Sequence, residues 1–222
     1  MTHPTFTLPA RLAFALTALL FSAGAVQAQD AAAGQKKAQM CIGCHGIPGY
    51  QASFPEVHKV PMIAGQNAQY IGAALAAYKK GDRKHPTMRA IAISLSDQDM
   101  LDLSAFYAGL GSQEQKDVPD VPTVPNTAVA ALLAKGACIS CHGANFNKPL
   151  DGTYPKIAGQ PADYLYVALK AYSIESNPQI GRANPVMSAQ VKQFKLSELK
   201  AMAKYIGSLP GEVRTVPESR FR

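Results

Sequence analysis

The sequence predicts an all-α protein made of two tandem domains of similar sequence, and three observations carry this prediction. One pentapeptide pattern occurs twice, the residues after each copy repeat in the same order, and helix-capping signals recur while alternating strand patterns are nearly absent. We expect long loops between the helices of both halves.

The chain opens with the layout of a secretory signal peptide. An apolar run from Leu12 to Gly24 follows Arg11, and Val26-Gln27-Ala28 is a suitable cleavage site. An uncleaved membrane anchor is the alternative, but the run is short for a bilayer span of about 20 residues. We therefore expect residues 1–28 to be removed and the mature chain to be soluble in the periplasm.

All four cysteines lie in two copies of the pattern C-x-x-C-H, which are Cys41-Ile42-Gly43-Cys44-His45 and Cys138-Ile139-Ser140-Cys141-His142. This pattern is typical of covalent haem c attachment, in which two thiols add to the vinyl groups of one haem and the histidine binds its iron. On a helix the three side chains project from one side, toward one porphyrin. The sequence therefore predicts two covalently bound haem c groups.

Three other uses of these cysteines fit less well. A thioredoxin-like redox pair lies near a βαβ pattern, and none is visible here. Structural zinc needs four ligands per site, whereas each motif supplies three. A disulfide framework gives no reason for a histidine after each pair.

The residues after each motif repeat in order. The matching segments are Ile63-Ala64-Gly65-Gln66 with Ile157-Ala158-Gly159-Gln160, Tyr70 with Tyr164, Leu75-Ala76-Ala77-Tyr78 with Leu169-Lys170-Ala171-Tyr172, and His85-Pro86-Thr87-Met88 with Asn184-Pro185-Val186-Met187. Duplication explains this order. The recurrence of Gln66 as Gln160 and of Tyr78 as Tyr172 is explained by packing, with hydrogen bonds to haem propionates as the alternative.

The boundary between the halves is a proline-rich segment. Residues 112–126 contain Val118-Pro119, Val121-Pro122 and Val124-Pro125, and repeated proline favours an extended, semi-rigid tether. This divides the mature chain into an N-terminal domain, 29–111, and a C-terminal domain, 127–222. Each domain is small enough to have a modest core, so that a buried haem would supply much of its apolar surface.

Capping signals mark four helices. Asn67 and Gly81 bound a segment that runs to Lys80, and Ser96 opens another that ends before Gly111. In the second half, Pro161 and Asp163 suit a helix start. Ser197 suits the cap of a helix that stops at Pro210-Gly211.

The ligand on the far side of each iron decides the chemistry, because an open site permits peroxide chemistry and a filled one favours electron transfer. Met88 and Met187 each follow a proline by two positions, in a segment that we expect to be a loop. We predict that they are the ligands. His85 is the main competitor at the first iron, but Asn184 stands at its equivalent position.

The other mature-chain candidates have no equivalent in the repeat. His58 is unmatched, and Met40, Met62, Met100 and Met202 are expected to be core-filling side chains. Thioether ligation raises the reduction potential relative to two histidines, so both haems should have relatively high potentials.

The sequence resembles the dihaem cytochrome c4 family over essentially the whole mature chain. The resemblance rests on the two attachment motifs, the two Pro-x-Met segments, the repeated Ile-Ala-Gly-Gln and the proline-rich tether. The resemblance implies two tandem cytochrome c-type domains, each enclosing one covalently attached haem c, with haem edges facing across a pseudo-twofold interface. It implies Cys41, Cys44, His45 and Met88 at the first haem, and Cys138, Cys141, His142 and Met187 at the second. None of these eight positions departs from the family pattern.

The same resemblance implies an electron carrier, not an enzyme, that moves single electrons between a quinol-oxidising complex and a terminal oxidase. The alternative is the dihaem electron-accepting subunit of a periplasmic dehydrogenase, such as a flavocytochrome sulfide dehydrogenase. A dihaem peroxidase needs an accessible iron face, which the two methionines argue against. No small-molecule substrate is expected.

Charge differs between the halves. Residues 29–118 hold nine Lys or Arg and eight Asp or Glu, whereas residues 119–222 hold twelve and seven. We expect the C-terminal half to face an acidic partner or, by peripheral association, an anionic membrane surface, with an ordinary solvated surface as the alternative. The basic residues are scattered and lack the interleaved aromatic residues of a nucleic-acid platform, so no nucleic acid is expected.

Overall fold

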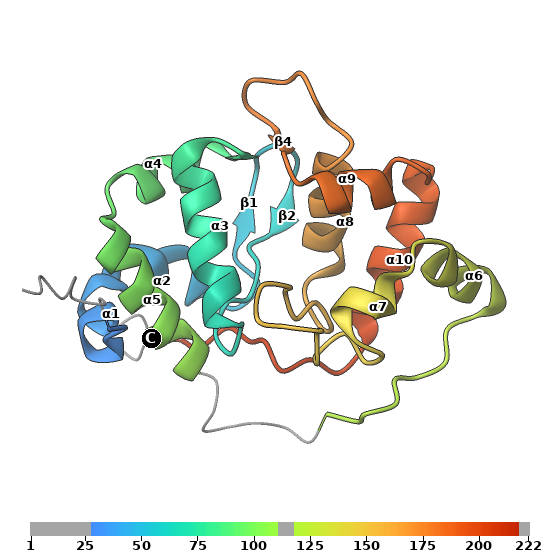
Figure 1. The fold of residues 1–222 in the computed structure, drawn as a ribbon, viewed down its shortest axis with the longest axis horizontal. Coiled ribbons are helices and arrows are strands. Elements are labelled where there is room, and N and C mark those ends of the chain that lie inside the picture. Colours follow the sequence, from blue (N-terminus) through green and yellow to red (C-terminus); the bar gives the residue numbers. More distant parts are fainter. Residues whose placement is uncertain (1–27, 111–117, 218–222) are drawn as a thin grey trace, which may run out of the picture.

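The computed structural model describes residues 28–110 and 118–217, which form two lobes side by side (Figure 1). The expected signal peptide, apart from Ala28, and the first part of the tether lie outside the described residues. None of the helices in the described part of the chain has the length and apolar character of a bilayer span.

Both lobes are helical, as predicted, and the strands are only two residues long. The N-terminal lobe contains α1 (Ala31–Lys37), α2 (Gln39–His45), β1 (Gln51–Ala52), β2 (His58–Lys59), α3 (Ala68–Lys80), β3 (Arg83–Lys84), α4 (Pro86–Ile93) and α5 (Asp97–Gly109). The C-terminal lobe contains α6 (Thr127–Lys135), α7 (Cys138–His142), α8 (Ala162–Ala171), β4 (Gly181–Arg182), α9 (Pro185–Val191) and α10 (Leu196–Ser208).

Most helix ends agree with the capping signals. The helix α3 follows Asn67 and ends at Gly81, whose φ of 93° places it in the left-handed region that glycine adopts without strain. Ser96 and Asp99 form a capping box at the start of α5. The predicted cap at Ser197 is wrong, because the Glu198 carboxylate accepts from the Lys195 N–H and α10 begins two residues before the expected start.

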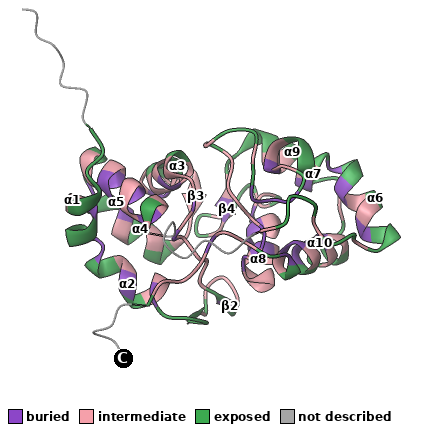
Figure 2. Ribbon diagram, turned by 90° about the horizontal axis from the view of Figure 1, so that it is seen from below, coloured by how far each residue is buried: buried purple, intermediate pink, exposed green. Residues whose placement is uncertain are grey.

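Each lobe has its own apolar core (Figure 2). In the N-terminal lobe the buried cluster includes Ile42, Leu95, Met100 and Leu103. In the C-terminal lobe it includes Leu133, Phe146, Leu165, Leu199, Met202 and Ile206. Met100 and Met202 are therefore core-filling, as predicted, whereas Met40 is 47% exposed and the prediction for it is wrong.

Equivalent segments of the two lobes meet at the interface. The strands β3 and β4 pair antiparallel, with Arg83 opposite Arg182, and these residues stand at matching positions before the two prolines of the repeat. When the same segment of each repeat pairs with its counterpart, the two lobes are related by an approximate twofold axis. Further along the interface, the C-terminal segment crosses to the first lobe, where Arg214 N–H donates to the Ala64 carbonyl.

The described part of the tether lies against the C-terminal lobe. The Asn145 amide donates to the Pro119 carbonyl, and the Tyr205 hydroxyl donates to the Thr123 carbonyl. Val121 and Val124 remain exposed beside these contacts. The second half of the proline-rich segment is thus held on one lobe.

Candidate functional site

The two C-x-x-C-H motifs are helical, as the haem-attachment geometry requires. The first lies at the end of α2 and the second makes up α7, and all four cysteines are free and partly buried. Burial raises the pKa of the Cys41 and Cys138 thiols. A redox-active C-x-x-C pair has the opposite property, a lowered thiol pKa, so these sites do not resemble thioredoxin-like centres.

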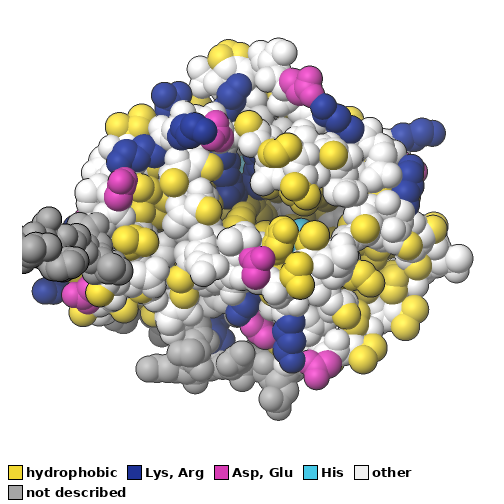
Figure 3. All heavy atoms as spheres, viewed as in Figure 1, with side chains coloured by type: hydrophobic (Ala, Val, Ile, Leu, Met, Phe, Trp, Pro, Cys, Tyr) yellow, Lys and Arg dark blue, Asp and Glu magenta, His cyan; other side chains and the backbone are white. Residues whose placement is uncertain are grey.

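The first motif opens into a cavity of about 370 Å³. Its lining brings together all four predicted residues of the first site, Cys41, Cys44, His45 and Met88. Most of the remaining wall is apolar and comes from α3, α4 and the loop around Ile63. Figure 3 shows a hollow in the middle of one face, lined by hydrophobic side chains.

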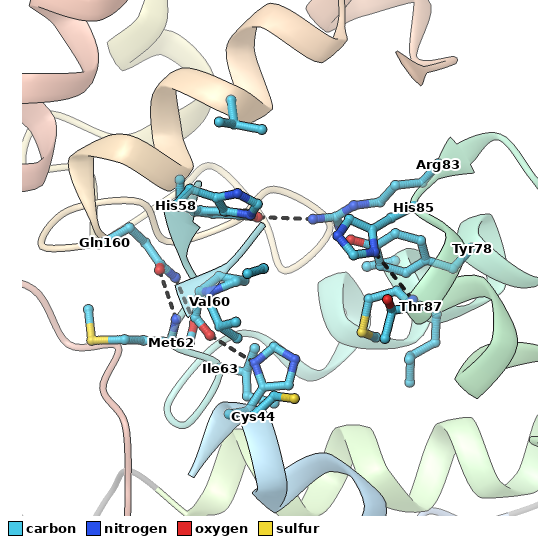
Figure 4. Close-up of a pocket in the computed structure, with 18 of the residues that line it drawn as sticks. Cys44, His58, Val60, Met62, Ile63, Tyr78, Arg83, His85, Thr87 and Gln160 are labelled. Atoms are coloured by element: carbon cyan, nitrogen blue, oxygen red, sulfur yellow. Dashed lines mark hydrogen bonds between the residues drawn. The ribbon is translucent and has the colours of Figure 1, made fainter. Parts of the chain in front are cut away.

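The wall of this cavity includes residues of both lobes. Figure 4 shows Gln160 reaching toward the segment that carries Met62, and Arg83 and His85 on the opposite side of the pocket. Tyr164 and Arg182, from the C-terminal lobe, also line it. A group bound at the first motif would therefore touch the domain interface.

Both motif histidines are oriented by the same kind of hydrogen bond. The Nδ1 atom of His45 lies 2.9 Å from the Pro61 carbonyl oxygen, and Nδ1 of His142 lies 3.1 Å from that of Pro155. A carbonyl oxygen only accepts, so Nδ1 carries the proton and Nε2 is left with a lone pair that can bind a metal. Burial lowers the pKa of both imidazoles, which favours the neutral form that binds metal.

The predicted methionines lie on short helices, not on loops. Pro86 opens α4 and Pro185 opens α9, so that Met88 and Met187 are the third residues of these helices. The loop prediction is wrong because each proline suits the first position of a helix, where its missing N–H costs nothing. The residue before each proline, His85 or Asn184, accepts a hydrogen bond from the methionine N–H.

In the C-terminal lobe two of the corresponding side chains pack against the same apolar cluster. His142 is buried, and Cys138 and Met187 both pack against the apolar cluster that contains Leu199 and Ile206. The four predicted residues of the second site therefore come from α7 and α9, and one residue of each helix packs against this core.

Two arginines and four tyrosines meet where the lobes join. Arg83 donates to the hydroxyls of Tyr70 and Tyr164, at 3.2 and 2.9 Å, and Arg182 donates to Tyr164 at 3.4 Å. The Arg83 guanidinium also lies over the Tyr78 ring, and that of Arg182 over the Tyr172 ring. We call these six residues the arginine–tyrosine cluster.

Among the described residues, no carboxylate forms an ion pair with either guanidinium group of the cluster. The hydrogen-bond partners found for both guanidinium groups are phenols, and the buried Nε of Arg83 has no partner in the described part of the chain. Burial raises the pKa of Tyr164, but Arg83 and Arg182 outweigh this and lower it to about 8. Tyr70, where burial dominates, has a pKa of about 12.

This unbalanced charge is the test of whether haem fits. Haem brings two carboxylates as well as an apolar macrocycle, and a buried guanidinium is stable only when it is paired. The cavity supplies thiols and an imidazole at one end, an apolar wall, and an unpaired Arg83 Nε at the interface. The residues of the chain therefore fit the group that the motifs predict.

The other candidate ligands have different surroundings. His85 lines the same cavity, but its Nδ1 accepts from the Met88 N–H and its ring packs edge-on against Phe54. The His58 Nδ1 donates to the Glu56 carbonyl, and its ring stacks on Tyr164. Met62 is partly exposed and outside both core clusters, so the expectation that it fills a core is wrong.

The sequence prediction missed the arginine pair. Arg83 and Arg182 each stand three residues before the proline of the repeat, and this shared position was a signal for them. The paired positions alone did not indicate that the two side chains would meet each other.

Comparison with known proteins gives consistent matches over both lobes. The family model described as Cytochrome c matches residues 31–110 and 127–210. Cytochrome c4 of Azotobacter vinelandii is 29% identical over 210 residues, which cover 89% of this chain and 95% of that protein. A thiosulfate dehydrogenase electron acceptor from Stutzerimonas stutzeri (strain A1501) is 28% identical, covering 87% of this chain and 92% of that protein.

A solved structure of similar fold matches both lobes. Reduced cytochrome c4 from Pseudomonas stutzeri has a TM-score of 0.59 and 25% identity, and the match covers 82% of this chain and all of that chain. The match therefore extends over two tandem domains and not over one alone.

Proposed function

The chain belongs to the cytochrome c family, as a dihaem electron-transfer protein of the cytochrome c4 type with two covalently attached haem c groups, and from this we propose how its residues serve the two haems. Cys41 and Cys44 attach the first haem, and His45 and Met88 are its axial ligands. The second haem takes Cys138 and Cys141, with His142 and Met187 as ligands. The observation that supports this most directly is that all four residues of the first set line one cavity.

A haem bound in this way supplies an iron that alternates between two oxidation states. The role of the chain is to keep the surroundings of the iron the same in both states. The carbonyls of Pro61 and Pro155 hold the imidazole rings through Nδ1, and the caps at His85 and Asn184 hold the first turn of each methionine helix. Fixed ligands on both faces leave no open position for peroxide or another small ligand.

The arginine–tyrosine cluster is the proposed site for carboxylates of the haems. Arg83 and Arg182 lie opposite each other in the β3–β4 pair, so one carboxylate from each lobe can be neutralised at the interface. Charge-assisted hydrogen bonds from guanidinium groups are strong and directional. Two haems whose carboxylates meet here would approach each other closely enough for an electron to pass between lobes.

We further propose that the protein works in the periplasm, between a quinol-oxidising complex and a terminal oxidase. One electron enters from a reduced partner and leaves to an oxidised one, with no bond made or broken. The exposed lysines on and near α10, Lys195, Lys200 and Lys204, give the C-terminal lobe a basic face for an acidic partner. Neutralising these three lysines should slow association with an acidic partner at low salt and have no effect at high salt.

A second candidate role has a specific observation in its favour. The related thiosulfate dehydrogenase electron acceptor supports a role as the acceptor of a dehydrogenase that oxidises a sulfur compound. The two roles differ in the electron donor. Rapid reduction of the oxidised protein by thiosulfate dehydrogenase and thiosulfate, with slow reduction by a quinol-oxidising complex, would favour the second role.

An optical and redox titration of the purified protein tests the ligand assignment. We expect two haems per chain and a methionine–ferric charge-transfer band. Met88→Ala and Met187→Ala should each remove about half of this band, because each haem has one thioether ligand. If the band is unchanged in both variants, the assignment is wrong. A native band that is insensitive to Met88→Ala and wholly lost in Met187→Ala would show that Met88 does not bind the first iron, and would leave His85 as the main competitor.

A further inference from the structure

Two buried glutamines cross the domain interface in opposite directions. Gln160, in the C-terminal lobe, accepts from the Met62 N–H at 3.0 Å and donates to the Met62 carbonyl at 2.7 Å. Gln66, in the N-terminal lobe, accepts from the Lys156 N–H at 2.9 Å and donates to the Lys156 carbonyl at 2.8 Å. Both residues are less than 5% exposed, and each bonds both backbone groups of one residue in the opposite lobe. Gln66 Oε1 also accepts from the N–H of Asn67 in its own lobe, at 3.0 Å.

The repeated tetrapeptide positions these glutamines. In Ile63-Ala64-Gly65-Gln66 the Gln66 N–H donates to the Ile63 carbonyl, and Gly65 has a φ of 81°. A turn with a hydrogen bond between its first and fourth residues and a positive φ at the third requires glycine there. The second copy forms the same turn, with Gly159 at 73°, so each lobe points its glutamine across the interface.

The backbone that each glutamine binds is the backbone that orients a motif histidine. The Pro61 carbonyl, which accepts from His45 Nδ1, and the Met62 N–H, which donates to Gln160, belong to the same peptide group. In the other lobe, the Pro155 carbonyl accepts from His142 and the Lys156 N–H donates to Gln66. Figure 4 shows the bonds from Gln160 to the Met62 backbone.

We propose that Gln160 and Gln66 are positioning residues for the axial histidine of the opposite lobe. Each completes a chain of hydrogen bonds that runs from the histidine Nδ1–H through one peptide group to the glutamine Oε1. A peptide whose N–H is hydrogen-bonded has a more negative carbonyl oxygen, because bonds in such a chain polarise one another. A stronger acceptor at Nδ1–H makes the imidazole a better donor to the iron and fixes its ring.

As a consequence, the reduction potential of each haem depends on a glutamine of the opposite lobe. Gln160 stabilises the oxidised iron of the N-terminal lobe, and Gln66 stabilises that of the C-terminal lobe. Separation of the lobes would break both of these hydrogen-bond chains at once. The reduction potentials of the two haems therefore depend on the docking of the two domains. A glutamine that merely packs at the interface would affect its own lobe or both lobes alike.

The test measures the reduction potentials of both haems in Gln160→Met and Gln66→Met, which keep the side-chain volume and remove the hydrogen bonds. Gln160→Met should shift the potential of the N-terminal haem upward and leave the other unchanged, and Gln66→Met should do the reverse. The Met88→Ala and Met187→Ala variants assign each potential to its lobe. The proposal would be overturned if neither potential shifts, if the shift occurs at the haem of the lobe that carries the substitution, or if both haems shift equally.

The chain offers a matched control beside Gln66. The Asn67 side-chain amide donates to the Tyr154 carbonyl at 2.9 Å, which also crosses the interface but does not involve the peptide that binds His142. The backbone N–H of Asn67, which donates to Gln66 Oε1, is retained when this side chain is replaced. Asn67→Leu should leave both potentials unchanged. A shift as large as that of Gln66→Met would show that any lost interface bond has this effect, and would overturn the proposal.

A measurement on the native protein covers the case in which a glutamine variant does not fold. The amide protons of Met62 and Lys156 should exchange with solvent as slowly as those of the buried helices, and fast exchange of either would contradict the bonds to glutamine. The inference rests on the proposed ligand roles of His45 and His142. A native spectrum without histidine–methionine ligation would refute those roles, whereas uncrossed potentials in spectrally normal variants would refute the glutamine proposal alone.

Discussion

In the N-terminal domain His85 caps the methionine helix, and in the C-terminal domain Asn184 does so. The donor–acceptor distance is 3.4 Å for the imidazole and 2.9 Å for the amide. The arginines differ as well, since Arg83 bonds two tyrosine hydroxyls and Arg182 bonds one. A duplicated sequence has therefore kept the geometry of the site while its supporting residues have diverged, and this divergence allows the two haems to differ.

The largest expected effect comes from preventing haem attachment in one domain at a time. In Cys41→Ala/Cys44→Ala no haem would cover the apolar wall of the cavity of about 370 Å³, and apolar surface left in contact with water costs roughly 25 cal/mol per Å². Because whole domains are stable by only about 5–15 kcal/mol, we expect the N-terminal domain to unfold. Circular dichroism and hydrogen exchange would measure this.

The matched variant is Cys138→Ala/Cys141→Ala. Here Cys138 and Met187 pack against the apolar cluster of the C-terminal domain, which can close around part of the space. We expect a smaller loss of helicity than in the first variant. Equal loss in both would mean that the two domains depend on haem to the same extent.

The second effect concerns the arginines. If Arg83 and Arg182 pair with haem carboxylates, replacing either by Gln should cost about 3–5 kcal/mol of unfolding free energy, because a buried carboxylate loses its partner. Arg83→Gln should cost more, since it also loses two phenol contacts. Denaturant unfolding measures this, with exposed Arg89→Gln as the control.

The sign of the change in unfolding free energy decides whether the arginines are paired with carboxylates. Two guanidinium groups without carboxylates would repel each other, so removal of one would stabilise the protein. A gain in stability in either variant would therefore contradict the carboxylate site at the interface.

The local features of the fold were predictable from the sequence, and the contacts between domains were not. The capping box of Ser96 and Asp99 depends on residues three positions apart, so its pattern alone identified the helix start. At Ser197 the same reasoning failed because Glu198 pairs with the Lys195 backbone, a competing box that begins two residues before Ser197. Met40 was misplaced because α2 buries only Ile42 and the face of α2 that carries Met40 is exposed to solvent.

The repeat indicated which residues matter at the interface, but not what they contact. Gln66 and Gln160 recur in the sequence, and packing alone accounts for such a recurrence. Their hydrogen bonds join residues that are 90 and 98 positions apart. No local pattern specifies such partners, because they are set by the way the two domains dock.

An exchange of the two caps gives the third effect. An N-cap is worth about 0.5–2 kcal/mol, and the longer bond of His85 suggests a weaker cap. His85→Asn should stabilise α4 by up to about 1 kcal/mol, reduced by the lost ring contact with Phe54. Asn184→His should destabilise α9 by a similar amount.

Amide exchange at Met88 and Met187 measures the caps directly, since each N–H is the donor to its cap. Exchange should slow at Met88 in His85→Asn and quicken at Met187 in Asn184→His. If both substitutions quicken exchange, each cap is adapted to its own domain and the two positions are not interchangeable.

The smallest effect concerns pH: we expect Tyr164 to make no pH-dependent contribution to the unfolding free energy. With the chain's own charges alone, Arg83 and Arg182 lower the pKa of Tyr164 to about 8, below its value of about 10 in an unfolded chain. The unfolded state would then bind more protons between pH 8 and 10, so stability would rise with pH over this range and be lost as the pH falls through 8. Haem carboxylates beside the same arginines would cancel their field and return the pKa of Tyr164 toward its ordinary value.

The wild type and Tyr164→Phe should therefore show the same change in unfolding free energy from pH 8 to 10. A rise that occurs in the wild type and disappears in Tyr164→Phe would show that the guanidinium charges at the interface are not neutralised, and that the carboxylates of the haems lie elsewhere.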